Sequence, residues 1–525
     1  MRDHTLSIDR SASPSVITYA DNFNVAVSFI DRHVDEGRAD KIAIHPVGSE
    51  TVTYGDLARN INRAGNGLKA LGLNAGDRVL MMVKDCAHFY FLFWGAIKAG
   101  FIPVPINTLL RAKDYQFMIE DSGASTVIYS PEFASEVEPA LDAANPGPAH
   151  YFRTEGDGQT LESLIADANG SLDAAPATPD APCFWLYSSG TTGTPKGAVH
   201  LHRDMVVTSE HYGLRSLGVK EDDICFSAAK LFFAYGLGNG MTFPLWVGAS
   251  AVLYPGPPTP DATFDTIEKF KPSIFFGVPT LYAAQLKALG QADRNLSSLR
   301  VCVSAGEALP ADIFTRWQKK TGTTILDGIG STEALHIFIS NLEDDYKAGT
   351  SGRMVPGYDA RIIGDDGEDV VKGDSGQLMI RGQSTASHYW NNPEKTASTM
   401  VDGWLNTGDT YILDEDGYYL YCGRNDDMLK VGGIWCSPFE IEAKLIEHPK
   451  VLEAAIVGRE DDEHLTKPEA FIVLNDQADA VEATKEELLV HCKEGLAKYK
   501  YPRWINFVEE LPKTATGKIQ RFKLR

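Results

Sequence analysis

The stretch YSSGTTGTPKGAVH, residues 187–200, gathers hydroxyl side chains, glycines and one lysine in a short length of chain. Gly190, Gly193 and Gly197 can adopt backbone angles that other residues avoid, which lets N–H groups wrap an anion. The hydroxyls and the charge of Lys196 would add to the binding of a phosphate. The order differs from the common phosphate loop, which is GxxxxGK followed by Ser or Thr. A Ser/Thr/Gly linker is the alternative, but the strand-like CFWLYS directly before the stretch favours a ligand loop.

Four further charged residues lie in short motifs that suit a nucleotide. GIGSTEALH is a second glycine and hydroxyl turn, whose carboxylate Glu333 can hold Mg²⁺. WLNTGD places Asp409 on a tight turn, where its carboxylate can accept both hydroxyls of a ribose. GRNDDMLKVGG supplies Arg424, and PKTATGK supplies Lys518. Each motif alone is weak evidence for a nucleotide site, because a lone surface lysine, for example, is usually just solvated. Together, and in this order, they are hard to explain by chance.

Alternating strand and helix patterns would position these motifs. The β-rich runs CFWLYSSG, SIFFGVPT, LRVCVSAGE and TTILDGIGSTE all end in or beside Gly, Ser or Thr. Helix-like segments such as FDTIEKFK and ADIFTRWQKKTG lie between them. Strand, polar loop and helix in repetition predict an α/β fold, with β-sheets flanked by helices and ligand loops at the strand ends.

The end of the chain has the pattern of a separate, small α+β domain. SPFEIEAKLIEHP predicts a helix with Ser437 as N-cap, and the strand-like runs EAAIVG and AFIVL follow. In TKEELLVHCKEGLAKY, Thr484 and Glu487 form a second capping-box pattern, and RWINFV predicts a last strand. The polar, glycine-flanked segment CGRNDDMLKVGG suits a hinge. We therefore expect a large domain over residues 1–425 and a small one over residues 426–525.

Size and composition limit the functional classes. A chain of 525 residues suggests two or more domains, and its formal charge of −22 argues against nucleic acid or an anionic membrane as a partner. The apolar run FYFLFWGAI is too short to span a bilayer, and no secretory signal is visible. Seven cysteines without a CxxC pair indicate a reduced cytoplasm rather than disulfides or zinc. The spacing of His200, His202 and His211 fits no common zinc pattern.

The combination of motifs resembles the adenylate-forming superfamily, which holds acyl-CoA synthetases, peptide-synthetase adenylation domains and firefly-type luciferases. The resemblance covers essentially the whole chain. It implies a large N-terminal domain with several subdomains that binds ATP and an acid, and a small C-terminal domain that swings between two poses. The chain has no carrier-protein domain after RFKLR, which argues against a peptide-synthetase module.

The resemblance also implies a role for each motif. Lys518 would be the catalytic residue, bridging the incoming carboxylate and the α-phosphate where negative charge builds up. Thr192 and Glu333 would hold Mg²⁺. The residues expected to bind ATP and AMP are Ser188, Ser189, Gly190, Thr191, Thr192, Gly193, Thr194, Lys196, Gly306, Glu307, Asp327, Gly328, Ser331, Thr332, Asp409 and Arg424.

The second half-reaction of this superfamily transfers the acyl group to coenzyme A. By resemblance, the hinge falls at Asp426, and Lys430, Gly432 and Gly433 line the pantetheine tunnel. The attacking thiol belongs to coenzyme A, so the nearby cysteines are interpreted as bystanders. Relatives are often silenced by acylation of the lysine that matches Lys518, so a protein acetyltransferase and deacetylase are conceivable partners.

CFSAAKLFFAYGLGN and DGIGSTEALHIF are similar to segments of benzoate-CoA ligases. Glycine and alanine at Gly328, Gly330 and Ala305 would leave a flat slot that favours an unsubstituted aromatic acid. His336 would either accept a 4-hydroxyl group or be a packed histidine that shapes the slot. Phe233 stands where many relatives carry His. The expected acid pocket consists of Phe233, Ala234, Tyr235, Ala305, Gly330, His336 and Ile337.

We therefore expect a benzoate-CoA ligase that uses ATP, Mg²⁺ and coenzyme A. Three alternatives stay open at this stage. The first is a ligase for 4-hydroxybenzoate or another small ring acid. The second is a free-standing domain that adenylates an aryl acid for a carrier protein. The third is a nucleotide-binding regulator without catalysis, against which Lys518, Glu333 and Asp409 together argue.

Overall fold

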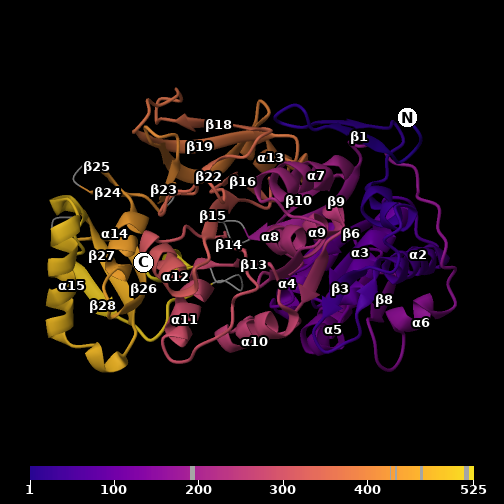
Figure 1. Ribbon diagram of the computed structural model, residues 1–525, viewed down its shortest axis with the longest axis horizontal. Helices are drawn as coiled ribbons and strands as arrows, with labels where there is room; N and C mark the ends of the chain where they lie inside the picture. The colour runs from indigo at the N-terminus through magenta and orange to yellow at the C-terminus, as the bar shows by residue number, and fades with distance from the viewer. Residues whose placement is uncertain (190–194, 426, 432–433, 462–464, 514–518) are drawn as a thin grey trace.

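The protein is an α/β structure with a large N-terminal part and a small C-terminal unit (Figure 1). The computed structural model describes residues 1–189, 195–425, 427–431, 434–461, 465–513 and 519–525. The architecture confirms the fold class expected from the alternating pattern of strands and helices.

The central sheet of the large part has the strand order β17-β16-β15-β14-β13-β11-β12-β3-β4. Its strands from β3 to β15 run parallel along this order, so β13, β14 and β15 end at the same edge of the sheet. The loops after these strands therefore start from one edge of the sheet, at the strand ends where the sequence predicted ligand loops. The strands are β3 (Ile42–Pro46), β4 (Val52–Thr53), β11 (Ile224–Ser227), β12 (Ser250–Leu253), β13 (Ile274–Gly277), β14 (Val301–Ser304), β15 (Ile325–Gly330), β16 (Ile337–Ser340) and β17 (Arg353–Met354).

Helices cover this sheet, and the helix-like sequence segments appear among them. α10 and α12 correspond to the predicted FDTIEKFK and ADIFTRWQKKTG. The π-helical segments η1, η3 and η4 are each continuous with an α-helix. The helical elements here are η1 (Val27–Asp31), α1 (Arg32–Asp35), α7 (His202–Thr208), η3 (Ser209–Ser216), α8 (Ala234–Leu237), η4 (Gly238–Thr242), α9 (Phe243–Val247), α10 (Pro260–Phe270), α11 (Pro279–Leu289) and α12 (Ala311–Thr321).

A second parallel sheet has the order β6-β5-β7-β8, and β1 pairs with β2 at the start of the chain. The apolar run FYFLFWGAI lies in α3 and is buried throughout, which explains its composition. No helix in the described ranges is long and apolar enough to cross a membrane. The elements are β1 (Leu6–Asp9), β2 (Val16–Tyr19), α2 (Tyr54–Ala70), β5 (Arg78–Met82), α3 (Ala87–Ala99), β6 (Ile102–Pro105), α4 (Ala112–Ser122), β7 (Thr126–Tyr129), α5 (Ala134–Ala143), β8 (His150–Arg153) and α6 (Leu161–Ala166).

Two antiparallel sheets complete the large part. One has the order β20-β10-β9, and the other is β18-β19-β22-β21 with β23 paired to β22. Both matter for the site, because β9, β10, β22 and β23 carry predicted nucleotide-binding residues. The elements are β9 (Pro182–Ser189), β10 (Pro195–Leu201), β18 (Tyr358–Ile363), β19 (Ser375–Gly382), β20 (His388–Tyr389), α13 (Pro393–Thr399), β21 (Met400–Val401), β22 (Trp404–Leu413) and β23 (Tyr419–Arg424).

The C-terminal unit packs two helices against the sheet β26-β27-β28. The side chain of Ser437 accepts a hydrogen bond from Glu440 N at 3.2 Å, which confirms the predicted cap of α14. The predicted cap at Thr484 is wrong. α15 begins at Glu482, since Glu482 and Ala483 extend the helix, and Thr484 is buried inside it. The elements are β24 (Leu429–Val431), β25 (Ile434–Cys436), α14 (Pro438–Ile446), β26 (Val451–Glu460), β27 (Thr466–Leu474), α15 (Glu482–Gly495) and β28 (Trp504–Phe507).

The C-terminal unit lies at one end of the molecule, next to α11 and α12 (Figure 1). α14 contacts α12 and β23 of the large part. The side chain of Lys287 on α11 donates a hydrogen bond to Asn475 O at 3.0 Å. The two parts therefore share a contact surface that includes the strand that leads into the predicted hinge.

All seven cysteines carry free thiols. Cys86 is half-buried, and the other six are buried. Burial raises the pKa of the Cys86 thiol to about 11. These thiols are therefore protonated at neutral pH and fill space in the core.

Candidate functional site

The first loop candidate connects the two strands of a hairpin. β9 and β10 are antiparallel, with Ser188 opposite Lys196 and Ser189 opposite Pro195. This register brings both ends of the loop together. The predicted residues between the strands, Gly190, Thr191, Thr192, Gly193 and Thr194, lie outside the described residues.

Gly197 has a different role from the predicted one. It lies inside β10, opposite Tyr187, in extended backbone rather than in the loop. A Cβ atom there would lie 3.1 Å from Trp185 and 3.3 Å from Trp390. The two indoles stack with their centroids 4.6 Å apart. Gly197 therefore makes room for an indole pair that braces the hairpin, and the prediction that its backbone wraps an anion is wrong.

The candidate magnesium ligand Glu333 is held by two hydroxyl groups. Ser188 Oγ donates to Glu333 Oε1 at 3.0 Å, and Tyr389 OH donates to the same oxygen at 2.8 Å. Burial and the carboxylate of Glu333 raise the pKa of Tyr389, so the phenol stays protonated and can donate. The carboxylate is thereby fixed next to the last described residues of β9.

Three cations lie in the surroundings of Glu333. Burial lowers the pKa of Lys196, the positive charge of Lys395 lowers it further, and Glu333 opposes both effects. Burial also lowers the pKa of Arg424, but the negative charges of Asp409 and Glu333 raise it, and the net effect is a raised pKa. Lysine and arginine around one carboxylate match the charge pattern that a metal-bound polyphosphate requires.

A buried histidine holds the segment that follows β15. His200 Nε2 donates to Thr332 O at 2.8 Å, and His200 Nδ1 lies 2.9 Å from Asp204 Oδ2. Both side chains are fully buried. A chain of hydrogen bonds therefore runs from Asp204 through His200 to the backbone of a predicted phosphate-binding residue. In the same segment, Ser331 Oγ accepts a hydrogen bond from Ala334 N at 3.1 Å.

Asp409 and Arg424, the predicted ribose-binding pair, lie opposite one another on β22 and β23. Arg424 Nη1 donates to Asp409 Oδ1 at 3.0 Å and to Thr407 O at 2.9 Å. Asp409 was expected on a tight turn, but it lies inside β22. The turn-like signal came from Gly408, whose φ of +72° makes a local irregularity within the strand. The structure thus brings the predicted pair together through an ion pair.

The loop after β14 and the end of β15 hold three more predicted nucleotide-binding residues. Gly306 is exposed and has a φ of +94°, which favours glycine. Glu307 follows it in the same loop and is half-buried. Asp327 is buried, and its Oδ2 accepts a hydrogen bond from Leu309 N at 3.3 Å. Burial raises the pKa of Asp327 to about 8, so the neutral form prevails at neutral pH and anchors the loop.

The predicted turn at Gly328 and Gly330 is a strand instead. Both residues lie in β15, which pairs antiparallel with β16. A Cβ atom on Gly328 would lie 2.8 Å from Ile339 O, and one on Gly330 would lie 2.6 Å from His336 O. The glycines are therefore required for the close approach of β16.

His336 packs among aromatic rings at the predicted acid pocket. Its ring centroid lies 5.2 Å from Tyr212, 5.6 Å from Tyr235 and 4.5 Å from Phe243. Nε2 lies 3.1 Å from Asn239 Oδ1 and 3.3 Å from Tyr235 O. Because both partners are acceptors, Nε2 carries the hydrogen. Burial lowers the pKa of His336 to about 3, so the ring is neutral, and Nδ1 has no hydrogen-bond partner in the described part of the chain.

Tyr235 contacts this ring, and the other predicted pocket residues differ in burial. Tyr235 OH donates to Gly277 O at 3.1 Å and to Val303 O at 3.2 Å, which fixes the phenol at the ends of β13 and β14. Phe233 is half-buried beside Phe232. The buried members of the predicted set are Ala234, Ala305, His336 and Ile337.

Several predictions in the C-terminal unit lie outside the described residues, namely Lys518, Asp426, Gly432 and Gly433. Lys430 belongs to β24, and its backbone pairs with Trp435. Lys513 and Ile519 form a β-bridge on either side of residues 514–518. After the predicted hinge, Arg525 Nη2 donates to Asp427 Oδ1 at 2.6 Å.

Comparison with known proteins assigns the family. Residues 30–390 match the model of the AMP-binding enzyme family, and residues 440–518 match the AMP-binding enzyme C-terminal domain. The chain belongs to the AMP-binding enzyme family. The matched ranges leave residues 391–439, which include the predicted hinge, between the two models.

Individual relatives of this AMP-binding enzyme act on aromatic acids. It is 51% identical to the benzoate–CoA ligase of Thauera aromatica, with 99% of each chain covered. It is 46% identical to the 4-hydroxybenzoate–CoA/benzoate–CoA ligase of Rhodopseudomonas palustris, covering 96% of this chain and 94% of the relative. The crystal structure of the anthranilate CoA ligase AuaEII with anthranoyl-AMP matches with a TM-score of 0.93 and 43% identity, covering 96% and 97% of the two chains. A benzoate CoA ligase from Burkholderia xenovorans LB400 matches with a TM-score of 0.89 and 44% identity, covering 96% of this chain and 100% of that one.

Three residues of this AMP-binding enzyme escaped the sequence analysis. Tyr389 contacts Glu333 from far along the chain, and no local pattern points to it. His200 and Asp204 were visible, but His200 was considered only as a zinc ligand. The sequence held a weak signal for Asp204, because a carboxylate three residues after Leu201 can accept a hydrogen bond from the N–H group at the start of a helix. In the structure Asp204 accepts this bond from Leu201 N at 3.0 Å. No group of His, Cys, Asp and Glu in the described ranges could hold a metal ion by itself.

Proposed function

We propose that this AMP-binding enzyme is a benzoate–CoA ligase. The observation that carries the proposal is the 51% identity with the Thauera aromatica benzoate–CoA ligase over 99% of both chains. In the first half-reaction, ATP and benzoate give benzoyl-AMP and pyrophosphate. In the second, coenzyme A accepts the benzoyl group and AMP is released.

The described residues support roles in the first half-reaction. The benzoate oxygen attacks the α-phosphorus, and pyrophosphate leaves with its electrons. Negative charge on the phosphate oxygens must meet fixed donors and cations. We propose that Lys196 and Thr332 bind phosphate oxygens and that Asp409 accepts the ribose hydroxyls. We assign to Lys518 the bridge between the benzoate and the α-phosphate.

The second half-reaction requires the thiol of coenzyme A to replace Lys518 at the acyl carbonyl. We propose that residues 426–525 turn about Asp426 relative to residues 1–425. Lys430, Gly432 and Gly433 would then line the tunnel for the pantetheine arm, where glycine leaves space. α14 of the C-terminal unit contacts β23, and β23 ends just before Asp426. This contact therefore lies next to the chain segment that must rotate, which supports the proposal.

The described residues fit a magnesium ion at Glu333. Carboxylate and hydroxyl oxygens are the ligands that Mg²⁺ prefers. Both hydroxyl donors to Glu333 reach Oε1, so the other oxygen is available among the described residues. Glu333, with Thr192, would hold the ion. Bound Mg²⁺ would neutralise part of the charge of the polyphosphate.

The second candidate substrate is 4-hydroxybenzoate. Nδ1 of His336 is buried without a hydrogen-bond partner in the described part of the chain, and in the neutral ring it is an acceptor. A phenolic hydroxyl that reached it could donate a hydrogen bond. Benzoate stays the first candidate, because three aromatic rings pack on His336 and favour an apolar ligand.

A substrate panel tests the proposal. Release of AMP and of pyrophosphate is measured with benzoate, 4-hydroxybenzoate, 2-furoate and cyclohexanecarboxylate, each with and without coenzyme A. We expect the highest kcat/KM with benzoate, and AMP release that depends on coenzyme A. A preference for 4-hydroxybenzoate would favour the second candidate. Pyrophosphate release without transfer to coenzyme A would instead indicate an enzyme that loads a carrier protein.

A further inference from the structure

A cavity of about 490 Å³ on the large part is lined mainly by arginine. Its four arginines come from segments far apart in the sequence. Arg10 follows β1, Arg32 begins α1, Arg38 follows α1, and Arg215 belongs to η3. The only carboxylate in the lining is Glu36. In a chain with a formal charge of −22, this concentration of guanidinium groups requires a local explanation.

One of the arginines is paired within the protein. Arg10 donates to both oxygens of Glu210, from Nε at 2.8 Å and from Nη2 at 2.9 Å. Ser15 Oγ at 3.1 Å and Trp246 Nε1 at 3.1 Å donate to the same carboxylate, which is completely buried. Arg10 and Glu210 therefore cancel each other and form a fixed wall of the cavity.

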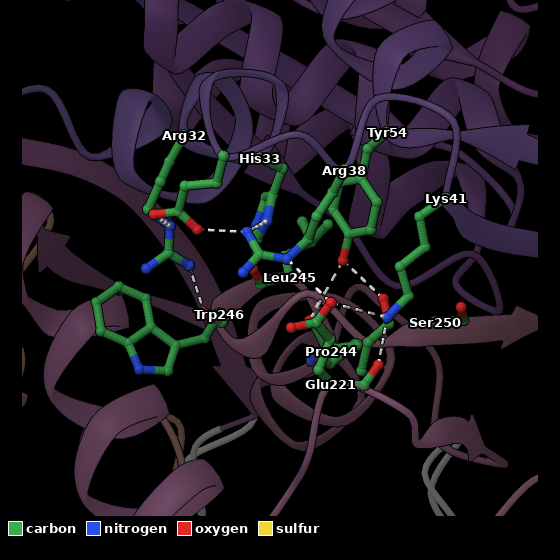
Figure 2. A network of polar contacts seen from close by, with 12 residues as sticks. Arg32, His33, Arg38, Lys41, Tyr54, Glu221, Pro244, Leu245, Trp246 and Ser250 are labelled. Carbon is green, nitrogen blue, oxygen red and sulfur yellow. Dashed lines mark hydrogen bonds and ion pairs between the residues drawn. The ribbon is translucent and has the colours of Figure 1, made fainter.

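Arg32 and Arg38 also line the cavity, and Figure 2 shows Arg32 above Trp246 and Arg38 beside His33. The guanidinium carbon of Arg32 lies 5.0 Å from the centroid of the Trp246 indole, and Arg32 Nη2 donates to Trp246 O. Arg32 Nε is buried and forms no hydrogen bond among the described residues, but it forms an ion pair with Glu36 Oε1 at 3.8 Å. Arg38 contacts Glu36, and its Nε lies 3.2 Å from Glu221 Oε1.

The neighbouring histidine adds no charge to the cavity. His33 Nε2 lies 2.6 Å from Leu245 O and donates to it, which leaves Nδ1 as an acceptor that faces Arg38 Nη1 at 3.4 Å. Burial lowers the pKa of His33 to about 3, so the ring is neutral. The cavity charge is therefore set by arginines and glutamates alone.

Arg215, which belongs to η3, also lines the cavity. Its side chain is exposed and forms no hydrogen bond or ion pair with any residue that the structure describes. Once Arg10 is cancelled by Glu210, Arg32, Arg38 and Arg215 remain against two carboxylates, Glu36 in the lining and Glu221 beside Arg38, which leaves an excess of positive charge. The guanidinium fork is suited to oxyanions, because two parallel N–H groups can bind two oxygens.

We propose that this cavity binds a small tetrahedral oxyanion of the phosphate class, as free phosphate or as the end of a phosphate ester. Arg215 supplies the guanidinium that no described residue pairs with, and Arg32 and Arg38, which also pair with Glu36 and Glu221, line the cavity beside it. The site is separate from the proposed active site, since none of its lining residues belongs to the predicted nucleotide or acid pockets. Its occupation does not depend on which acid the enzyme activates.

Isothermal titration calorimetry of the full chain tests the proposal. Saturating AMP and benzoate fill the AMP and acid parts of the candidate active site, Lys196→Ala reports any binding at its pyrophosphate part, and ionic strength is held constant with sodium chloride. The probes are inorganic phosphate, pyrophosphate and ribose 5-phosphate. We expect one site for phosphate in the wild type and a Kd at least about tenfold higher in Arg215→Gln. Arg215 is exposed, so this variant is expected to fold.

Two variants serve as matched controls. Arg316→Gln removes an exposed arginine from α12, where it pairs with Asp312 at 2.9 Å, and is expected to leave the Kd unchanged. Lys196→Ala alters the candidate nucleotide site and is expected to leave it unchanged as well. The proposal is overturned if phosphate gives no heat of binding, if Arg215→Gln binds like the wild type, or if Lys196→Ala abolishes binding. Binding of ribose 5-phosphate as tight as that of phosphate identifies an ester, and selective binding of phosphate or pyrophosphate identifies a free anion.

Discussion

Replacing Tyr389 by phenylalanine probes the support of the candidate magnesium ligand. The change removes the hydroxyl group that donates to Glu333 Oε1 at 2.8 Å. It keeps the aromatic ring, whose centroid lies 6.0 Å from Lys196 Nζ. A hydrogen bond to a charged group contributes about 1.5–3 kcal/mol, or about 10- to 150-fold in rate if it is needed in the transition state. Because Ser188 still donates to the same oxygen, we expect the lower end, a loss of about tenfold.

The assay separates the two half-reactions. Benzoate-dependent pyrophosphate release is followed at several Mg²⁺ concentrations, and thioester formation is measured with supplied benzoyl-AMP. Tyr389→Phe should slow the first and require more Mg²⁺, while leaving the second unchanged. Tyr418→Phe is the control, since its hydroxyl donates to the carboxylate of Asp345 outside the site. Pyrophosphate release within twofold of the wild type, or an equal loss in both half-reactions, would refute the reasoning.

Three further predictions concern the mechanism and the buried polar groups. Lys518→Ala should abolish pyrophosphate release but keep thioester formation from supplied benzoyl-AMP. His200→Ala leaves the Asp204 carboxyl buried without its partner, so it should cost about 3–5 kcal/mol of stability and raise the KM for ATP through Thr332. Asp327→Asn should raise stability at alkaline pH by a few kcal/mol, because the folded-state pKa of about 8 lies above the ordinary value near 4. Below pH 4 the Asp327 carboxyl is protonated in both the folded and the unfolded state. The wild type loses stability as pH rises from 4 toward 8, and its stability stays constant above pH 8.

Each of these predictions has its own check. Equal loss of both half-reactions in Lys518→Ala would contradict the bridging role. Combining His200→Ala with Asp204→Asn should restore most of the unfolding midpoint but not the KM for ATP; recovery of both would show a purely structural role. Thermal midpoints of wild type and Asp327→Asn between pH 4 and pH 9 should diverge as pH rises. Parallel curves would contradict a buried neutral Asp327.

Local patterns were enough for the fold and for the order of the elements. The strand signal of SIFFGVPT and LRVCVSAGE became β13 and β14, and the capping pattern at Ser437 began α14. Glycine was harder to interpret. Gly197 was assigned to an anion-binding loop, and Gly328 and Gly330 to a glycine and hydroxyl turn, but each lies in a strand where another chain segment leaves no room for a Cβ atom. A glycine in a sequence shows that a side chain is absent, and only tertiary packing shows why.

The candidate site was predictable where charge and motif coincided, as for the pair of Asp409 and Arg424. It was not predictable where the partner came from another element. Tyr389 reaches Glu333 only because β20 pairs with β10, and His200 reaches Thr332 across the space between β10 and the segment after β15. Such contacts depend on how sheets pack, which no short window of sequence records.

The buried thiols have a practical consequence for observing motion between the two parts. A thiolate attacks a maleimide dye; six of the native thiols are buried, and burial raises the pKa of the half-buried Cys86 thiol to about 11, which keeps it protonated at neutral pH. Cysteines introduced for Val371 and Val490, exposed aliphatic residues in the large part and on α15, would therefore be labelled against a silent background. Fluorescence energy transfer between two such dyes, recorded while ATP, benzoate and coenzyme A are added in turn, would report each change of separation within a single turnover.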